Sequence, residues 1–485
     1  MVKGEPRRKD QARLSQTIMA GGAGAASGSL ERELAFQLAS LRETPLPPAL
    51  VERAKLLILD SFGVLAGAAT SPAVKEVADA IGAWESAGRA TVLLNGRPAS
   101  PASAALANGT AAHALDFDDQ HDPARIHTLC TVLPAVLAAA EDAGGLSGGA
   151  LLRAVIVGAE FSSRLGLCCY RSLEHGCHPT AALGTLAAAA AAGTVYGLGP
   201  DQMLGALSLA FVQMGGTTQS NADGALSKRM GAGFAARGGV WSAHLARHGL
   251  AGPHRFLEGE AGLFRMYQRS DVRPDALLAQ LGHRWEMADV SLKPFPCCRA
   301  SHASLQIALE LHGEGIRPED IEGVDVHLGK VNHLMVGGRF SPEGKNAVVH
   351  AQFNLAYGFA EALRTGSVTL RTFQRSTIEA ADRAAIDRVR CIESSDIDQG
   401  SVAGVKMDVR LRSGASLQRL RTRVKGSPDE PMTREETIRK FRDCVEFGTG
   451  ASRARTDRFI DCVLRLEDRT TVATLVNEFP RASAS

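Results

Sequence analysis

Carboxylates and histidines gather in one segment of the sequence, residues 108–127. An alanine-rich, helix-like run ends in Asp116, Asp118 and Asp119, and the loop that follows carries His121 and His127. Like charges this close together cost free energy unless cations, hydrogen bonds or a ligand offset them. A chain that needed only solubility would scatter such groups over its surface. We therefore interpret the segment as one wall of an active site.

A second candidate is His178, in the segment Glu174–Pro179 that precedes a helical pattern beginning near Thr180. The positive end of a helix lowers the pKa of a neighbouring histidine, which suits a general base. The alternative is that His178 only caps the helix. The sequence leaves these two interpretations evenly balanced.

Cations open a glycine-rich helical pattern further along, where Lys228 and Arg229 stand at the start and Arg237 follows two turns later. Together with helix-start N–H groups, they could bind the carboxylates of a substrate. Taken alone, such a group is more often a solvated helix face. The sequence has neither a Walker motif nor a G-x-G-x-x-G after a strand pattern, so nucleotide binding is disfavoured.

Residues 293–302 combine a rigid backbone with reactive side chains. Pro294 and Pro296 stiffen the segment, and Lys293, Cys298 and His302 lie within it. A stiff connector that carries such groups between two domains is typical of an interdomain cleft. The alternative is a linker with buried thiols, because a cysteine without a neighbouring base is more often packing than a nucleophile.

The acidic segment also offers ligand types for a divalent ion. Their spacing matches neither an EF-hand loop nor an H-E-x-x-H helix, so we expect no metal. The nine cysteines show no C-x-x-C spacing, and the adjacent pairs among them suit neither a disulfide nor a zinc site. A reducing cytoplasm is the simplest location for such a chain.

Composition argues against several other classes of protein. The 54 basic and 52 acidic residues nearly balance, and the basic ones are dispersed, so nucleic acid is not expected as a partner. No run reaches 18 clean apolar residues, which predicts no membrane span. Residues 1–28 lack the apolar core of a signal peptide and are expected to form a flexible tail.

Hydrophobic periodicity predicts a mainly α fold, and 485 residues suit two domains. Residues 29–289 are helical almost throughout, and Ser71-Pro72 is expected to open one of the helices with a cap and a first-turn proline. Residues 290–428 form a smaller α+β domain, with strands expected over 323–328, 405–411 and 416–424 and helices over 301–312, 348–364 and 378–389. Residues 429–485 begin with a capping box at Thr433 and Glu436, and their helices should return to the first domain.

In this order, these segments resemble the MmgE/PrpD family, whose members include 2-methylcitrate dehydratase, cis-aconitate decarboxylase and iminodisuccinate epimerase. The resemblance runs from about Glu31 to Leu466. It rests on Leu59–Gly63, Asn108–Thr110, Asp116–Asp119 with His127, His178-Pro179, Lys228-Arg229 with Gly238, and Lys293–His302. It implies a helical domain, an α+β lid domain, a homodimer, and a cleft that works without metal or organic cofactor.

The resemblance also implies which residues line the cleft. The positions of the decarboxylase branch correspond here to Asp116, Gln120, His127, His178, Lys228, Lys293 and Cys298. Two of these depart from that branch, because Gln120 replaces a threonine and Cys298 replaces a histidine of the animal decarboxylases. Decarboxylation is therefore not our first expectation, although His302 could supply an imidazole nearby. Gln120, Cys298 and His302 are expected to contact the substrate.

Family substrates are small di- and tricarboxylates, and their chemistry starts at a carbon next to a carboxylate. The resemblance therefore implies that Lys228 and Lys293, with Arg229 as a weaker candidate, bind carboxylates and stabilise an enediolate. His127 and His178 are the expected acid and base, in an order that the sequence does not decide.

Asp116 is expected to orient a histidine or share a proton, whereas Asp118 and Asp119 should lie at the helix end or behind the reacting groups.

Our first expectation is a hydro-lyase of the 2-methylcitrate dehydratase kind, followed by a decarboxylase or an epimerase. A rival of another class is a non-catalytic carboxylate-binding dimer, which predicts that Lys228 and Lys293 are far apart or solvated. A metal-dependent hydrolase is a second rival.

Overall fold

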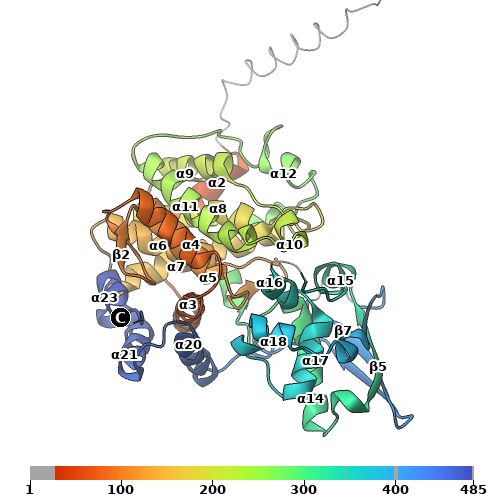
Figure 1. The fold of residues 1–485 in the computed structure, drawn as a ribbon. Coiled ribbons are helices and arrows are strands. Elements are labelled where there is room, and N and C mark those ends of the chain that lie inside the picture. Colours follow the sequence, from red (N-terminus) through yellow and green to blue (C-terminus); the bar gives the residue numbers. More distant parts are fainter. Residues whose placement is uncertain (1–27, 344–345, 398–401, 483–485) are drawn as a thin grey trace, which may run out of the picture.

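The computed structural model describes residues 28–343, 346–397 and 402–482, which form a large helical part and a smaller α+β part (Figure 1). One hydrophobic core draws its residues from Leu34 to Leu292 and again from Met432 to Phe479. A second core, from Phe295 to Val409, belongs to the α+β part. The mainly helical fold class expected from the sequence is confirmed. The expected tail, residues 1–28, lies outside the described residues except for its last position.

Long helices that bury small and apolar side chains build most of the helical part. Their bounds are α2 (Leu30–Ser40), α3 (Pro48–Gly67), α4 (Val74–Trp84), α5 (Pro101–His113), α6 (Leu129–Asp142), α7 (Gly148–Cys168), α8 (Pro179–Val195), α9 (Pro200–Gln213) and α11 (Ser227–Arg247). Shorter elements between them are the hairpin β1 (Ala90–Val92) and β2 (Arg97–Ala99), and the helices α10 (Gln219–Ala222), α12 (Leu263–Met266) and α13 (Asp275–Leu278). Among the helices described, none combines the length and the apolarity needed to cross a bilayer.

The start of α4 differs from the prediction. The sequence predicts a helix opened by Ser71-Pro72, but α4 begins at Val74. Ala73 has φ 74°, a left-handed conformation that a right-handed helix cannot include. Pro72 therefore lies in a turn and not in the first helical turn.

Glycines let α11 cross α5 and α8 closely, which fixes where the first turn of α11 lies. A Cβ on Gly233 of α11 would come within 2.3 Å of Leu106 O on α5, and one on Gly239 would come within 2.4 Å of the Ala188 Cβ on α8. The helix axes can approach this far only because these positions carry no side chain. The crossing places Lys228, in the first turn of α11, next to the C-terminal end of α5 and the N-terminal end of α8.

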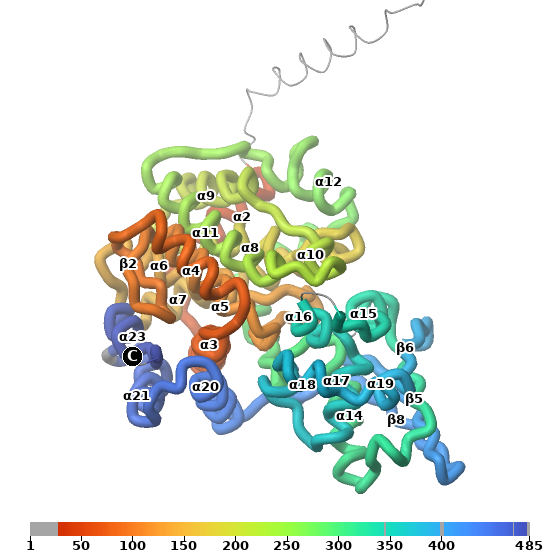
Figure 2. Tube along the Cα trace, in the orientation of Figure 1, coloured from red at the N-terminus to blue at the C-terminus, as the bar shows by residue number. Residues whose placement is uncertain are grey.

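The α+β part is a four-stranded sheet covered by helices. The strands are β5 (Ile321–Leu328), β6 (Val389–Glu393), β7 (Val405–Leu411) and β8 (Ser416–Arg421), in the order β6-β5-β7-β8. β5 is parallel to β6, and the other neighbours are antiparallel. The helices are α14 (His302–Gly313), α15 (Lys330–Val336), α16 (Ala347–Gln352), α17 (Leu355–Thr365), α18 (Arg375–Glu379) and α19 (Arg383–Asp387). In Figure 2, α14, α17 and α19 lie on one side of the sheet.

Two predictions for this part are wrong in detail. The single helix expected over 378–389 is replaced by the short α18 and α19, and the chain then enters β6. β6 is a half-buried edge strand that pairs, among the described strands, with β5 alone, far away in sequence, so its local pattern is weak. The helix expected over 348–364 breaks at Phe353, because the Asn354 side chain accepts a hydrogen bond from Tyr357 N and starts α17.

The last helices return to the helical part, which the sequence predicted. α20 (Arg434–Gly448) begins with the expected capping box of Thr433 and Glu436 and packs against α3. α21 (Arg453–Leu464), α22 (Leu466–Arg469) and α23 (Val472–Glu478) follow, and Figure 1 shows α20 and α21 next to α3. The Phe459 ring joins them, at 5.1 Å from the Phe62 ring and 5.6 Å from the Phe441 ring.

The close crossing of α5 and α11 predicts that Gly233→Ala is destabilising. The added methyl group would meet the backbone of α5, and overpacking of this kind costs about 1–3 kcal/mol of unfolding free energy. The matched control is Gly313→Ala at the end of α14, where an added Cβ would meet no described atom within 4 Å beyond its own helix, so the change should be close to neutral. Guanidinium unfolding of both variants measures the difference, and equal midpoints would contradict the prediction.

Candidate active site

One cavity lies between the helical part and the α+β part. It is lined by every member of the set Asp116, Gln120, His127, His178, Lys228, Lys293 and Cys298. The segment between α5 and α6, the N-cap of α8, the first turn of α11 and the connector after β4 (Val290–Ser291) supply these residues. β4 pairs with β3 (Gln120–His121), which holds the acidic loop against the connector.

Asp116 is the residue at which the lysines of the cavity meet. Its carboxylate accepts hydrogen bonds from Lys228 Nζ at 2.6 Å and from Lys293 Nζ at 3.1 Å. Lys293 Nζ also donates to Asp116 O at 2.8 Å, and all three side chains are buried. The sequence predicted that Asp116 would orient a histidine or share a proton. In the structure its carboxylate is instead hydrogen-bonded to two lysines.

These contacts fix the charges in the cavity. Burial alone would raise the pKa of Asp116, but Lys228 and Lys293 outweigh it and hold that pKa well below its usual range. Burial alone would lower the pKa of Lys293, and the Asp116 carboxylate reverses this, so that the pKa is raised. Two ammonium groups thus share one carboxylate, and the surplus positive charge suits an anionic ligand.

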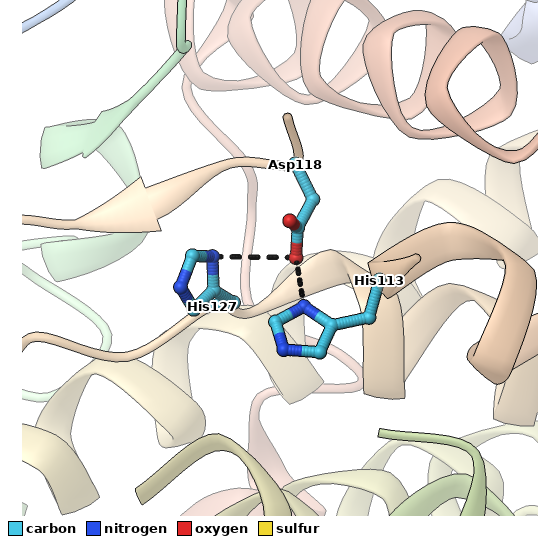
Figure 3. A group of neighbouring side chains, drawn as sticks. All are labelled: His113, Asp118 and His127. Atoms are coloured by element: carbon cyan, nitrogen blue, oxygen red, sulfur yellow. Dashed lines mark hydrogen bonds and ion pairs between the residues drawn. The ribbon is translucent and has the colours of Figure 1, made fainter. Parts of the chain in front are cut away.

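Asp118 joins two histidines, as Figure 3 shows. Its Oδ2 accepts a hydrogen bond from His113 Nδ1 at 2.7 Å and lies 3.2 Å from His127 Nδ1. The same nitrogen of His127 donates to Asp119 O at 2.7 Å. Since His127 Nδ1 carries a proton, the hydrogen-bond pattern assigns the lone pair of its neutral ring to Nε2.

His113 is neutral in this arrangement. Burial lowers its pKa to about 4, although the Asp118 carboxylate acts in the opposite direction. Its ring lies 4.9 Å from the His127 ring and 6.0 Å from the His178 ring, measured between centroids. His113 therefore packs behind both cavity histidines.

His113, Asp118 and His127 are also close enough together to surround a metal ion. Their hydrogen bonds do not fit that role well. Asp118 Oδ2 lies at hydrogen-bond distance from both Nδ1 atoms, so these nitrogens hold protons where a metal would need lone pairs. The group fits a hydrogen-bonded support for His127 better than a set of metal ligands.

His178 is the N-cap residue of α8 and also lines the cavity. Its Nδ1 accepts a hydrogen bond from Ala181 N at 3.4 Å. Burial holds the pKa of His178 well below its usual value, and Lys228 lowers it further. The ring is therefore neutral, with its proton on Nε2.

Gln120 and Cys298 are the two cavity residues that we expect, from the sequence, to depart from the decarboxylase branch. Gln120 lines the cavity, and its Nε2 donates to Asp122 Oδ1 at 3.2 Å. Burial raises the pKa of the Cys298 thiol to about 11, and Asp116 adds to the effect. Cys298 is consequently a protonated thiol at neutral pH and not a reactive thiolate.

Arg229 and His302 do not lie among the described residues that line the cavity. Arg229 Nη1 donates to Pro72 O at 3.2 Å. His302 is fully buried, with Nε2 at 3.2 Å from Cys297 O and Nδ1 at 3.3 Å from Arg299 Nη1. Both ring nitrogens are thus engaged, and neither is offered to a substrate.

The structure adds residues that the sequence did not single out. His113 had a local signal, because it stands in the same acidic segment five residues before Asp118. Arg125 also stands in that segment, and it lines the cavity while its Nη1 donates to Asn332 Oδ1 at 3.2 Å. Phe353 had no such signal, since only the helix break places its ring 5.1 Å from Lys228 Nζ.

Comparison with known proteins covers both parts of the molecule. The model of the MmgE/PrpD N-terminal domain matches residues 32–274, and that of the MmgE/PrpD C-terminal domain matches residues 295–466. The chain belongs to the MmgE/PrpD family. Lys293 lies between the two matched regions, so the family domains meet at the connector.

Relatives of known name cover nearly the full length of this MmgE/PrpD chain. A cis-aconitate decarboxylase-like protein of Aspergillus oryzae is 28% identical over 93% of the chain and 97% of its own length. A cis-aconitate decarboxylase of Aspergillus terreus is 28% identical over 93% of the chain and 96% of its own length. The enzyme of that name from Mus musculus is 27% identical over 91% of each chain.

The hydrogen bonds of His113 and His127 predict that this MmgE/PrpD protein does not depend on a metal. Metal analysis of the purified protein should find far less than one ion per chain. Turnover should be unchanged after chelation, because both Nδ1 protons point to Asp118 Oδ2 and leave neither nitrogen free to bind a metal. Activity that falls on chelation and returns with a divalent ion would support the metal-dependent rival instead.

Proposed function

We propose that this protein, as a cytoplasmic homodimer, is a cofactor-independent lyase for a small di- or tricarboxylate that acts by removing a proton next to a carboxylate. The observation that carries the proposal is the convergence of Lys228, Lys293, His127 and His178 on one cavity. The non-catalytic rival predicts lysines that are far apart or solvated, whereas both are buried and bonded to Asp116. The decarboxylase names of the relatives support the same reaction class.

The lysines suit the first chemical step. Loss of the proton leaves an electron pair that spreads into the neighbouring carboxylate as an enediolate. Ammonium groups already fixed in a buried site stabilise this charge without the reorganisation that water requires. Arg125 and Arg299 also line the cavity, so the site suits a substrate with more than one carboxylate.

The hydrogen bonds support different catalytic roles for His127 and His178. His127 donates through Nδ1 and keeps a lone pair on Nε2, which suits the base. His178 accepts through Nδ1 and keeps a proton on Nε2, so it suits a hydrogen-bond donor to a substrate oxygen. A neutral imidazole at a helix N-terminus can polarise such an oxygen without becoming charged.

In the proposed dehydration, His127 Nε2 takes the proton from the carbon next to a carboxylate. The electron pair of that C–H bond enters the carboxylate as the enediolate, held by Lys228 and Lys293. Its return forms a C=C double bond and breaks the C–O bond of the hydroxyl on the adjacent carbon. His178 donates a hydrogen bond to the departing oxygen, and the His127 imidazolium supplies the proton that completes water.

We favour dehydration of the 2-methylcitrate kind over decarboxylation because of the cavity side chains. Cys298 stands where the animal decarboxylases have a histidine, and the nearby His302 has both ring nitrogens engaged. Decarboxylation of a cis-aconitate-type substrate is the second candidate, favoured by the names of the relatives. Epimerisation would share the same carbanion-like intermediate.

A substrate panel tests the reaction class. The purified protein is incubated with citrate, 2-methylcitrate, cis-aconitate and iminodisuccinate, while absorbance follows double bonds and a second assay follows carbon dioxide. We expect double-bond formation from a hydroxy-tricarboxylate without carbon dioxide. Carbon dioxide release from cis-aconitate would select the second candidate, and no turnover of any carboxylate would overturn the proposal.

Replacing each histidine should separate the two steps. His127→Ala should lower kcat at least about a hundredfold, the usual scale for a general base, and abolish exchange of the substrate C–H for deuterium in heavy water. His178→Ala should slow elimination and leave that exchange measurable, because the base remains. Mass spectrometry of recovered substrate measures the exchange.

The matched control for these variants is His283→Ala, an exposed histidine outside the cavity, which should behave like the wild type. Undiminished exchange in a folded His127→Ala protein would remove His127 from the role of base. Loss of exchange in His178→Ala alone would reverse the assignment of the two residues.

A further inference from the structure

Three successive carbonyl groups at the end of α5 are each held by a side chain from a distant segment. Gln352 Nε2 donates to Leu115 O at 2.6 Å. Lys293 Nζ donates to Asp116 O, and Lys440 Nζ donates to Phe117 O, each at 2.8 Å. The donors come from α16, from the connector and from α20, so no two belong to one element.

The turn at Leu115–Phe117 needs such support. Asp116 has φ 52°, in the left-handed region that non-glycine residues adopt infrequently. The turn lies outside α5 and precedes β3, so its carbonyls take part in neither element. The distant donors thus satisfy buried carbonyls that neither α5 nor β3 uses.

Lys440 is built into this turn from the far side. Its Nζ lies 2.7 Å from Asp60 Oδ1 on α3 and 3.8 Å from the centroid of the Phe117 ring. Burial raises the pKa of Asp60 to about 6, and the Lys440 ammonium opposes that shift. α3 and α20 therefore fix a cation against the peptide that follows Asp116.

Gln352 links the turn to the α+β part. Its Nε2 also lies 3.3 Å from Pro296 O, and its backbone carbonyl oxygen accepts a hydrogen bond from Cys298 N at 2.9 Å. One residue of α16 thus contacts both the turn with Asp116 and the connector that carries Lys293. A displacement of the α+β part would move both at once.

We propose that Gln352 and Lys440 are positioning residues that hold the Leu115–Phe117 turn so that the Asp116 carboxylate stays between Lys228 and Lys293. Neither residue lines the active-site cavity. Their effect on turnover passes through Asp116, and in this respect the inference rests on the proposed function. Their effect on the turn itself does not depend on the reaction.

The test uses four variants of the full chain. Lys440→Met alone would leave Asp60 as an unpaired buried charge, so the informative protein is the double variant Asp60→Asn/Lys440→Met. Gln352→Met removes the donor to Leu115 O with little change of volume. The matched control is Arg439→Met. Arg439 is an exposed neighbour of Lys440 on α20. Both residues, together with Phe117, line a second cavity of about 500 Å³ outside the active site.

A crystal structure of the double variant gives the deciding measurement. We expect Asp116 to leave the left-handed conformation and its carboxylate to move out of hydrogen-bond distance of Lys228 Nζ. Turnover should fall roughly tenfold to a hundredfold in the double variant and in Gln352→Met, the scale for misplacement by about 1 Å, and stay unchanged in Arg439→Met. Lys440→Arg keeps donors for Phe117 O and Asp60 and should restore most of the activity.

A double variant that keeps φ near 52° and the contact of Asp116 with Lys228 would overturn the proposal, whatever its activity. Because this measurement needs no substrate, its result does not depend on whether the proposed function is correct. If the wild-type protein turned over no carboxylate, the proposed function would fail, and the position of Asp116 in the variant would still decide the role of Lys440.

Discussion

The pairing of one buried carboxylate with two buried lysines is the constraint on which the rest of the structure depends. Removing such ions from water costs several kcal/mol each, and only close contacts offset that cost. The contacts of Asp116 with Lys228 and Lys293, at 2.6 and 3.1 Å, meet this requirement. Since Lys228 belongs to α11 and Lys293 to the connector, both contacts persist only while the connector stays packed against the helical part.

The three carboxylates of the acidic segment point in different directions, which reduces the electrostatic repulsion between them. Asp116 contacts the lysines, Asp118 contacts His113 and His127, and Asp119 accepts hydrogen bonds from Thr128 N at 2.9 Å and Leu129 N at 3.1 Å where α6 begins. The left-handed conformation of Asp116 separates the first of these from the other two. Neighbouring acids thus have separate partners, and only the first faces the cations of the cavity.

Membership of the MmgE/PrpD family explains the framework, and the cavity side chains determine what it does. Helix crossings at glycine, such as Gly233 against Leu106 O, set the distances between the segments that carry the site. Relatives named cis-aconitate decarboxylase share this length of chain at 27–28% identity. A shared framework does not fix the reaction, because the reaction depends on the side chains that line the cavity, Gln120 and Cys298 among them.

The sequence by itself determined the fold class, the capping box at Thr433 and the segments that supply the cavity, because helix periodicity and caps depend on residues close together in the chain. Only the tertiary structure decided the partners. Asp116 meets lysines 112 and 177 positions away, and this replaced the expected contact with a histidine. In the structure, Arg229 and His302 are not among the described residues that line the cavity, and β6 forms by pairing with β5. Such contacts follow from how helices cross and strands pair across the whole chain, which no local pattern records.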